Sequence, residues 1–383
     1  MDFELNETQR LIRQQAADFA ARRVAPGARQ RDIDGNYPAE IIREMGALGM
    51  FGGVVPEAYG GAGLDYISFA LLCEEISKAD SSVRTVLSVQ ISLVATPILK
   101  FGSEAQKQKY LPRLCKVEWI GCFGLTEPDA GSDVQQIKTF AQKTPGGWRL
   151  NGRKIWISNG GIAQLAIVIA QTERGNPRKM AAFLVETSAP GFSSRDIHGK
   201  LGLRASNTAE LILDGVKVPD SALLGEVGQG FAVAMAALDN GRYSVAAGCL
   251  GIAQGSLEAS VAYAKERHTF GKPIAAHQMV QDMIARMVVD IDASRLLLCR
   301  AGELKNQSKP NTLETCVAKY YCSEAAVRCA NDAIQIHGGM GYSNEYPVER
   351  YLRDARVATI YEGTSQIQKL IIGGFATGIR AFA

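Results

Sequence analysis

The chain has 383 residues, of which 46% are hydrophobic and 21% are charged, and its formal net charge is +3. This length predicts two or three domains with cores of their own and excludes a small module. Because the charge is nearly balanced, the sequence gives no long-range attraction to nucleic acid or to an acidic membrane surface, and we expect neither as a partner.

The N-terminal third of the chain is predicted to be helical. Asn6 and Gln9 form a capping-box pair, and Ala16 and Phe19 follow at helical spacing. The runs ISFALLCEEISKA and VATPILKFGSEAQKQKYLPRL continue in the same manner. We therefore expect an N-terminal α-helical domain over residues 1–120.

The pattern then changes to that of strands. WRLNGRKIWIS divides into two short runs around an Asn-Gly turn, and AELILDGVKVP alternates around Asp-Gly. LAIVIAQT and MAAFLVET are apolar runs of strand length. We expect a middle β domain, of the barrel or sandwich type, over residues 121–228.

The last part of the sequence is helical again. MVQDMIARMVVDIDASRLLL places Val280, Ile284 and Met287 on one apolar stripe, and CVAKYYCSEAAVRCANDAIQIHGG is helix-like up to its glycines. We expect a C-terminal helical bundle over residues 229–383. The fold class is therefore α+β multidomain, in the order helices, sheet, helices.

The eight cysteines are scattered in apolar segments, without a CxxC pair or a Cys/His metal spacing, and indicate reduced core thiols. The opening MDFELNETQR is acidic and polar, so we expect no signal or transit peptide. No apolar run approaches the roughly 20 residues needed to span a bilayer. The sequence predicts a soluble cytoplasmic protein, of the bacterial cytosol rather than the mitochondrial matrix, without a membrane partner.

Several common catalytic signatures are missing from the sequence: GxGxxG after a strand, GxxxxGK before Ser or Thr, GxSxG and HExxH. A Rossmann dehydrogenase, a P-loop NTPase, an α/β-hydrolase and a zincin are thus disfavoured. The four histidines show no ligand spacing, so we predict no metal site. Cofactor chemistry without a Rossmann signature remains.

Three separated stretches share the motifs of a known family: CFGLTEPDAGSD (122–133), ERHTFGKPIAAHQMVQ (266–281) and QIHGGMGY...RYLRDARVATIYEGTSQIQ (335–368). Together they resemble the acyl-CoA dehydrogenase flavoproteins, over essentially the whole chain. The resemblance implies the fold of that family, FAD, an acyl-CoA substrate and an electron-transferring flavoprotein as electron acceptor. It also implies a homotetramer, built as a dimer of dimers, with a role in fatty acid or amino acid catabolism.

Glu362 of the YEGT motif is the candidate catalytic residue. Removing two hydrogens across the α,β bond of a thioester needs a base for the α proton, and a carboxylate in a dry pocket is a stronger base than one in water. The resemblance implies that Glu362 is this base, while flavin N5 accepts the β hydride. From the residues alone, an acid that favours the start of the helix near Thr364 is the simpler interpretation.

The resemblance also implies contacts with FAD. Those of the subunit's own cofactor are Phe123, Leu125, Thr126, Gly131, Ser132, Trp156, Ile157 and Ser158. Those at the FAD of a neighbouring subunit are Arg267, Phe270, Gln278, Gln335, Ile336, His337, Gly338, Gly339, Thr364, Ser365 and Gln366. The structural alternatives are a polar loop, a buried strand tryptophan, an exposed helix-end arginine and helix-ending glycines.

Substrate contacts follow from the same resemblance. Ser132 reaches the substrate, and Asp239 and Arg242 of LDNGR hold CoA. Gly363 has no side chain and lets the thioester approach the backbone, where the N–H of the base helps to polarise the thioester carbonyl. Arg242 fits equally well as a structural ion-pair residue.

SSVRTVLSVQISL places Arg84 among apolar residues, with Ser88 one helical turn later. A buried cation needs a partner, and a substrate carboxylate would be one. This stretch resembles the glutaryl-CoA dehydrogenase branch, in which an arginine and a serine bind the distal carboxylate. An acid that this branch carries seven positions earlier is Ser77 here, and other segments resemble short-chain members. A structural acid as the partner of Arg84 stays open, and the acyl group is short or dicarboxylic.

Other functions are compatible with the same fold. One is the dehydrogenation of an acyl carrier protein thioester, and another is an acyl-CoA oxidase that passes electrons to O₂. A non-catalytic scaffold or a nucleic-acid-binding protein would lack the base or carry a basic patch, and the sequence has neither feature. We expect FAD-dependent conversion of an acyl-CoA to the trans-2-enoyl-CoA.

Overall fold

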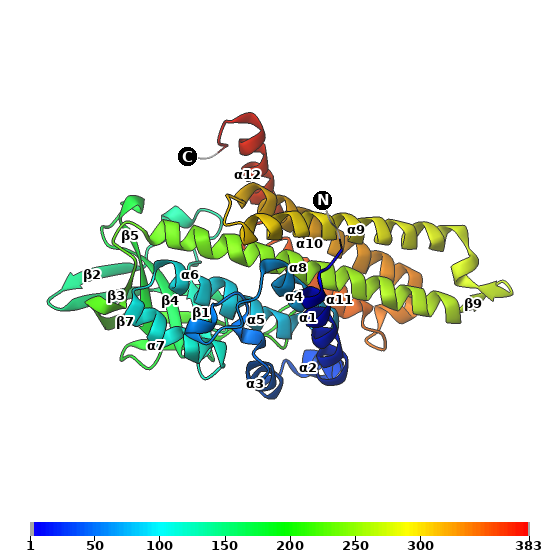
Figure 1. The fold of residues 1–383 in the computed structure, drawn as a ribbon, viewed down its shortest axis with the longest axis horizontal. Helices are drawn as coiled ribbons and strands as arrows, with labels where there is room; N and C mark the ends of the chain where they lie inside the picture. Colours follow the sequence, from blue (N-terminus) through cyan, green and yellow to red (C-terminus); the bar gives the residue numbers. More distant parts are fainter. Residues whose placement is uncertain (1–3, 382–383) are drawn as a thin grey trace.

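The chain folds into a helical part, a sheet and a second helical part, in that order (Figure 1). The computed structural model describes residues 4–381. The sheet lies at one end of the molecule, and α8 runs from it along the helical bundle. This order confirms the predicted fold class, while the domain boundaries stay a prediction.

In the N-terminal part, the helices α4 and α5 are buried, and α4 packs against α1 and against α8 of the C-terminal part. Asn6 and Gln9 form the predicted capping box at the start of α1. Two π-helical segments extend α1 and α5, and such segments are frequent near functional sites. The elements are α1 Glu7–Phe19, π Ala20–Val24, α2 Ala28–Asp34, α3 Ala39–Ala47, α4 Tyr66–Ala79, α5 Ser81–Ser88, π Val89–Ala95, α6 Thr96–Phe101 and α7 Glu104–Cys115.

The middle part is an eight-stranded sheet in the order β6-β7-β3-β2-β4-β5-β8, with β1 paired to β4. The pairing of β1 with β4 is parallel, and β3 and β7 form a long antiparallel ladder. The strands are β1 Gly121–Gly124, β2 Phe140–Thr144, β3 Gly147–Ser158, β4 Leu165–Gln171, β5 Met180–Glu186, β6 Phe192–Asp196, β7 Thr208–Pro219 and β8 Leu223–Leu224.

Two strands continue through positions that the sequence predicted as turns. β3 runs through Asn151 and Gly152, and β7 runs through Asp214 and Gly215. The Gly215 N–H donates to the Asn151 Oδ1 at 2.8 Å, and the ladder shifts register here. The predicted Asn-Gly turn was wrong, because Asn151 stays in the ladder of β3, and Asp214 and Gly215 lie opposite it as a bulge in β7.

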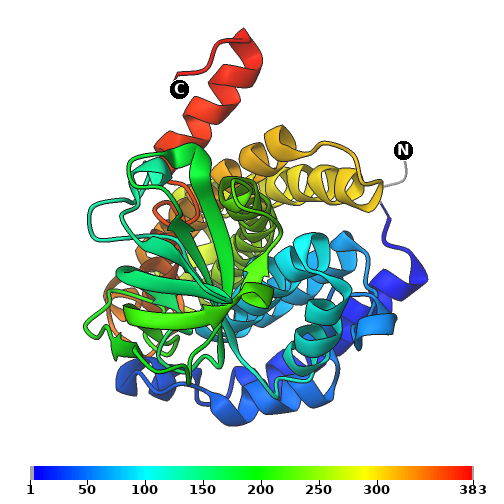
Figure 2. The ribbon, with the colours of Figure 1, turned by 90° about the vertical axis from the view of Figure 1, so that its left-hand side faces the viewer.

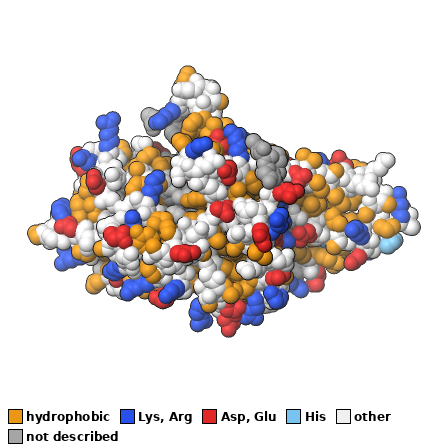
Figure 3. Space-filling model, in the orientation of Figure 1, with side chains coloured by type: hydrophobic (Ala, Val, Ile, Leu, Met, Phe, Trp, Pro, Cys, Tyr) orange, Lys and Arg blue, Asp and Glu red, His pale blue; other side chains and the backbone are white. Residues whose placement is uncertain are grey.

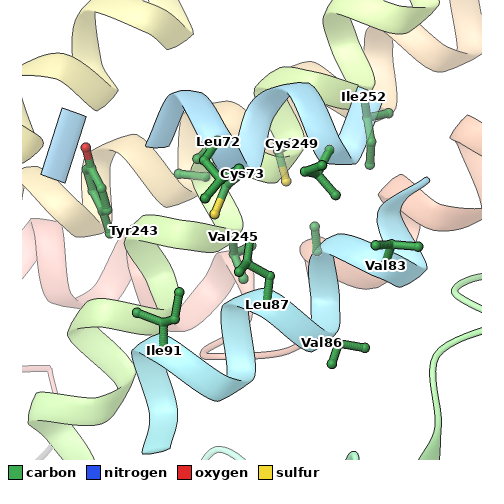
Figure 4. Packing of buried hydrophobic residues seen from close by; sticks show 14 of the residues in the cluster. Leu72, Cys73, Val83, Val86, Leu87, Ile91, Tyr243, Val245, Cys249 and Ile252 are labelled. Atoms are coloured by element: carbon green, nitrogen blue, oxygen red, sulfur yellow. The ribbon is translucent and has the colours of Figure 1, made fainter. Parts of the chain in front are cut away.

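The C-terminal part is a bundle in which α8 packs between α4 and α10. Figure 4 shows Leu72 and Cys73 of α4, Leu87 of α5, and Val245 and Cys249 of α8 in one apolar layer. The last helix, α12, leaves the body and projects outward (Figure 2). The elements are α8 Gly230–Glu266, β9 His268–Thr269, β10 Lys272–Pro273, α9 Gln278–Asn306, α10 Thr312–His337, α11 Val348–Ala358 and α12 Ser365–Thr377.

Within the part of the chain that the structure describes, two continuous helices are long and apolar enough to cross a membrane, judged by length and composition alone. They are Ser81–Phe101, with 21 residues, and Gly230–Glu266, with 37. The expectation that no apolar run approaches this length was therefore wrong. Their most apolar windows are 94% and 67% buried inside the protein, as in core helices.

All eight cysteines are free thiols, and only Cys299 among them is partly exposed. Burial raises the pKa of Cys73, Cys122 and Cys329 to about 12. The prediction of reduced core thiols is confirmed. The compartment inferred from them stays a prediction.

Helix α11 ties the sheet to the helical bundle. The carboxylate of Asp354 accepts a hydrogen bond from the Leu203 N–H at 2.6 Å, and Arg353 donates to the Leu201 carbonyl at 3.1 Å. Arg353 also forms an ion pair with Asp32 of α2 at 2.6 Å. The segment that follows α11 is therefore anchored to both neighbouring parts of the fold.

Asp354→Asn is expected to make stability less sensitive to pH. Burial raises the pKa of Asp354 to about 7. Its contribution to the free energy of unfolding is therefore present below the unfolded pKa of about 4 and is lost as pH rises through about 7. Urea unfolding at pH 5 and pH 8 should differ less for Asp354→Asn than for the wild type. The exposed control Asp214→Asn should keep the wild-type difference.

Candidate active site

Glu362 lies in the turn between α11 and α12. Its φ is +53° and that of Gly363 is +87°, so two consecutive residues adopt the left-handed region, which is strained for glutamate. Thr364 caps α12, because its hydroxyl accepts a hydrogen bond from the Ile367 N–H at 3.2 Å. The capping position belongs to Thr364, and the Glu362 carboxylate instead faces α8.

Three side chains hold this turn by its carbonyl oxygens. Arg242 Nε and Gln368 Nε2 each donate to the Glu362 carbonyl at 3.2 Å. Lys319 Nζ donates to the Gly363 carbonyl at 2.6 Å, and Gln368 Nε2 donates to it at 3.1 Å. These bonds offset the strain of the left-handed turn and fix the direction of the Glu362 side chain.

Glu362 is half-buried as a residue, but its Oε2 is buried and has no hydrogen-bond partner. A Cβ at Gly241 of α8 would lie 2.0 Å from this oxygen, so a larger residue would displace the acid. Burial raises the pKa of Glu362 to about 7, against the opposing charges of Lys319, Arg84 and Arg242. A carboxyl group with this pKa is suited to accept a proton near neutral pH.

Arg84 of α5 is 2% exposed. Its guanidinium donates to the Tyr361 hydroxyl at 3.2 Å, while its Nε is buried without a partner. Within residues 4–381, Arg84 forms no ion pair with a carboxylate. The alternative that Arg84 is paired with a structural acid is therefore excluded for these residues. A buried cation in this state is incomplete without an anion.

Ser88 lies one turn after Arg84, and both side chains face α8. The Ser88 hydroxyl is hydrogen-bonded to the Ser244 hydroxyl. Arg84 lies against Gly248, where a Cβ would be 2.5 Å from its Nε. Gly241, Ser244 and Gly248 form one stripe of α8. The structure thus brings Glu362, Arg84 and Ser88 to a common surface.

The two residues expected to hold CoA form an ion pair with each other. Arg242 is 4% exposed and donates to Asp239 Oδ1 at 2.9 Å. Asp239 also accepts a hydrogen bond from the Thr312 hydroxyl at 2.9 Å. Of the two roles that the sequence left open for Arg242, its geometry matches the structural ion pair.

The two segments expected along the flavin are tied together by buried bonds. Lys154 Nζ donates to the Leu125 carbonyl at 3.0 Å and pairs with Glu127 at 2.7 Å. The Ile155 N–H donates to the Thr126 carbonyl at 3.0 Å. Burial lowers the pKa of Lys154 to about 8. The loop after β1 and the end of β3 therefore act as one rigid unit.

The exposed residues of this rigid unit are suited to contact an aromatic ring system such as a flavin. Trp156 is 59% exposed, with φ +61°, so a large indole stands on the surface at the end of β3 instead of in a buried strand. Thr126 and Ser158 are partly exposed, and Gly131 and Ser132 are exposed. The side chains of Phe123, Leu125 and Ile157 are buried in the core, so only their backbone groups remain for a cofactor.

The residues expected at a neighbour's FAD lie far from these segments. Arg267, Phe270 and Gln278 are exposed, Phe270 to 95%. Figure 1 shows β9 beside them at the end of the molecule opposite the sheet. One chain alone does not bring these residues to its own Trp156.

The remaining expected contacts divide into exposed and internal groups. Gln335, Gly338, Gly339 and Gln366 are exposed, whereas Thr364 caps α12 as described. Ile336 is buried, and so is His337, whose ring stacks on Tyr263 at 4.3 Å. The Ser365 hydroxyl donates to Glu324 at 2.6 Å. The side chains of Ile336, His337 and Ser365 are therefore directed into their own chain.

Some residues of the site were not predicted from the sequence. They are Lys319, Gln368 and Tyr361 around the Glu362 turn, and the Lys154–Glu127 pair. Lys319 had a visible signal, since it is a single lysine in the apolar helical run CVAKYYCSEAAVRC. Tyr361 and the Lys154–Glu127 pair gave no comparable signal, because their partners are distant in sequence. Gln368 lies five and six residues after its acceptors, but a polar residue in the first turns of a helix is too common to stand out.

Among residues 4–381 no group of three or more His, Cys, Asp or Glu side chains could hold a metal ion.

Residues 6–118, 122–216 and 228–376 match the N-terminal, middle and C-terminal domains of acyl-CoA dehydrogenases. Fold and site define a flavoenzyme that uses FAD to oxidise a CH–CH bond. The chain belongs to the acyl-CoA dehydrogenase family.

Relatives of known activity cover nearly the whole chain. The mitochondrial short-chain specific acyl-CoA dehydrogenase of Rattus norvegicus is 45% identical over 97% of this chain and 90% of its own. A glutaryl-coenzyme A dehydrogenase solved with glutaryl-CoA has a TM-score of 0.96 and 41% identity, covering 99% and 98% of the two chains. A chain solved in work on the electron transferring flavoprotein of Acidaminococcus fermentans has a TM-score of 0.97 and 43% identity, covering 98% and 99%.

Proposed function

We propose that this acyl-CoA dehydrogenase forms the trans-2-enoyl thioester of a short acyl-CoA that carries a distal carboxylate. The observation behind this choice is Arg84, a buried cation without a carboxylate partner that faces the same stripe of α8 as Glu362. An acyl chain with an anionic end supplies the missing partner.

Glu362 is the base in this proposal. Its unpartnered Oε2 takes the α proton, and bound FAD supplies the acceptor for the β hydride. The N–H of Glu362 makes no hydrogen bond within residues 4–381, so it is free to donate to the thioester carbonyl and acidify the α proton. The Lys154–Glu127 pair fixes the segments that would carry the flavin.

The spacing of the two charged groups supports a short chain. Glu362 lies against Gly241 and Arg84 against Gly248, seven residues later. Seven residues of α-helix rise about 10 Å. One contact of about 3.5 Å joins Glu362 to the α carbon of the substrate, and another joins Arg84 to its distal carboxylate. About 3 to 4 Å then remain for the part of the acyl chain between the α carbon and the carboxylate. This span fits a four- or five-carbon diacid chain. Ser77 stands where the glutaryl branch carries an acid and bonds to the Ser81 hydroxyl at 2.9 Å, so we propose that the product keeps its carboxylate.

The proposal includes a homotetramer, built as a dimer of dimers, in the cytoplasm. Its support is the exposed apolar surface on α12 and α9, which a monomer would leave in water, including Leu370, Phe375, Met279 and Val289. The exposed hairpin next to Arg267 then reaches a neighbour's FAD.

Figure 3 shows acidic and basic side chains interspersed over the visible face, without a large patch of one sign. We propose an electron-transferring flavoprotein as the acceptor.

An anaerobic screen of thioesters tests this function. The purified protein should be yellow and should bleach fastest with succinyl-CoA or glutaryl-CoA, more slowly with butyryl-CoA, and least with matching carrier-protein thioesters. Mass spectrometry of the product should show the loss of two hydrogens only. Fastest bleaching by butyryl-CoA would overturn the diacid substrate but keep the dehydrogenase. Rapid reoxidation of the bleached enzyme by O₂ would favour an oxidase.

A further inference from the structure

Lys319 of α10 is a buried lysine that the chemistry described so far does not use. It has no exposed surface, and no carboxylate forms an ion pair with it within residues 4–381. Burial lowers its pKa to about 8. Its one hydrogen bond goes to the Gly363 carbonyl at 2.6 Å. A buried ammonium that forms no ion pair is costly, so the position of Lys319 beside the Glu362 turn needs a physical explanation.

Geometry gives the first part of the reason. Both peptide groups after Glu362 point their carbonyls inward, and the left-handed turn persists only if they are held there. Arg242 and Gln368 hold the first carbonyl, and Lys319 and Gln368 hold the second. Lys319 is therefore the one charged donor on the Gly363 side of the turn.

Charge gives the second part. Arg84, Arg242 and Lys319 face Glu362 from α5, α8 and α10, and Tyr361 lies beside it in the chain. Arg242 is paired with Asp239, and a distal substrate carboxylate would pair with Arg84. Lys319 is then the only one of the three cations whose charge no anion but Glu362 balances. The other groups that face it are two neutral thiols and Arg242, and these thiols belong to Cys249 and Cys316.

We propose that Lys319 is a positioning residue for the catalytic base. It fixes the left-handed turn through the Gly363 carbonyl, and its ammonium keeps the Glu362 carboxylate ionised after the substrate has neutralised Arg84. This inference rests on the proposed role of Glu362. It gives Lys319 a measurable effect on the pH at which the base becomes active.

The test is the pH profile of anaerobic flavin bleaching by the best thioester of the screen. Lys319→Met removes the charge and should move the acid limb of the profile upward by about one pH unit, with about a tenfold lower rate at the foot of that limb. Lys319→Arg keeps a charge and should restore the limb towards the wild-type position. Lys305→Met is the matched control, because Lys305 is also buried, has its pKa lowered to about 8, and bonds to the Asn240 side chain instead of to a carbonyl of the turn.

A second readout does not depend on turnover. Infrared difference spectra of the resting enzyme should show the carboxyl band of Glu362, identified by its absence in Glu362→Gln, titrating at higher pH in Lys319→Met. A wild-type limb and band in Lys319→Met, or an equal shift in Lys305→Met, would overturn the proposal. If Lys319→Met does not fold, Lys319→Gln carries the same test. Normal bleaching by Glu362→Gln would instead remove the base itself, a result distinct from failure of the lysine.

Discussion

Glu362→Gln is expected to remain folded and yellow, to bind its acyl-CoA, and to reduce its flavin about 10² to 10⁴ times more slowly than the wild type. The amide has the size of the carboxyl group and fits the space beside Gly241, but it cannot take the α proton. Stopped-flow absorbance during anaerobic mixing measures the rate. Equilibrium titration of the flavin spectrum with the thioester measures binding.

A matched control separates loss of the base from loss of the fold. Glu303→Gln changes an exposed glutamate of α9 and should bleach at the wild-type rate.

The pH dependence of stability gives a second check on Glu362. Burial raises the pKa of Glu362 to about 7, so ionisation of this carboxyl group lowers the free energy of unfolding as pH rises through that value. Glu362→Gln should accordingly gain stability over the wild type at pH 8 and not at pH 4. Near-normal bleaching in this variant would assign the base to another group.

Arg84→Met is expected to shift the substrate preference from a diacid thioester towards butyryl-CoA. With a four- or five-carbon diacid thioester, loss of a buried charge pair costs about 2 kcal/mol or more, which is about a thirtyfold fall in kcat/KM. Butyryl-CoA has no carboxylate to pair. At a pH above the acid limb, where Glu362 is ionised with or without the Arg84 charge, its kcat/KM should hold or rise, since the variant no longer buries an unmatched cation. The ratio of the two kcat/KM values is the quantity to measure.

Arg350→Met provides the control for this ratio. Arg350 is also a buried arginine with an unpartnered Nε, but it lies in α11 and donates to the Ala79 carbonyl at 3.1 Å. Its replacement should affect both thioesters equally, through stability alone. A similar loss on both substrates in Arg84→Met would mean that no distal carboxylate binds there.

The order of helices and strands was predictable because periodicity is a local property. The capping box at Asn6 is an example, since both partners lie within four residues. The Asn-Gly dipeptide at 151 was misread for the opposite reason. Its conformation depends on Gly215, a residue of another strand, whose N–H the Asn151 side chain accepts. A local turn preference cannot anticipate a bulge that a distant strand imposes.

The candidate site divides in the same way. Glu362 could be selected because its YEGT motif and the two other motifs resemble those of the family, and Arg84 could be selected because a cation in apolar surroundings is visible in the sequence. The unpaired state of Arg84 could not, since it depends on which acids the folded chain brings near. Lys319 is 44 positions from its acceptor Gly363, and no spacing rule connects them. The groups that tune the base therefore emerge only when α8 and α10 are packed together.

The path of the chain after the base has a structural consequence. Thr364, two residues after Glu362, caps α12, and α12 then projects from the body of the molecule (Figure 2). Any partner that binds this projecting helix therefore contacts a segment whose first residues lie next to the proposed base. In the proposed tetramer, a neighbouring chain that contacts α12 therefore contacts a helix that begins beside the proposed base.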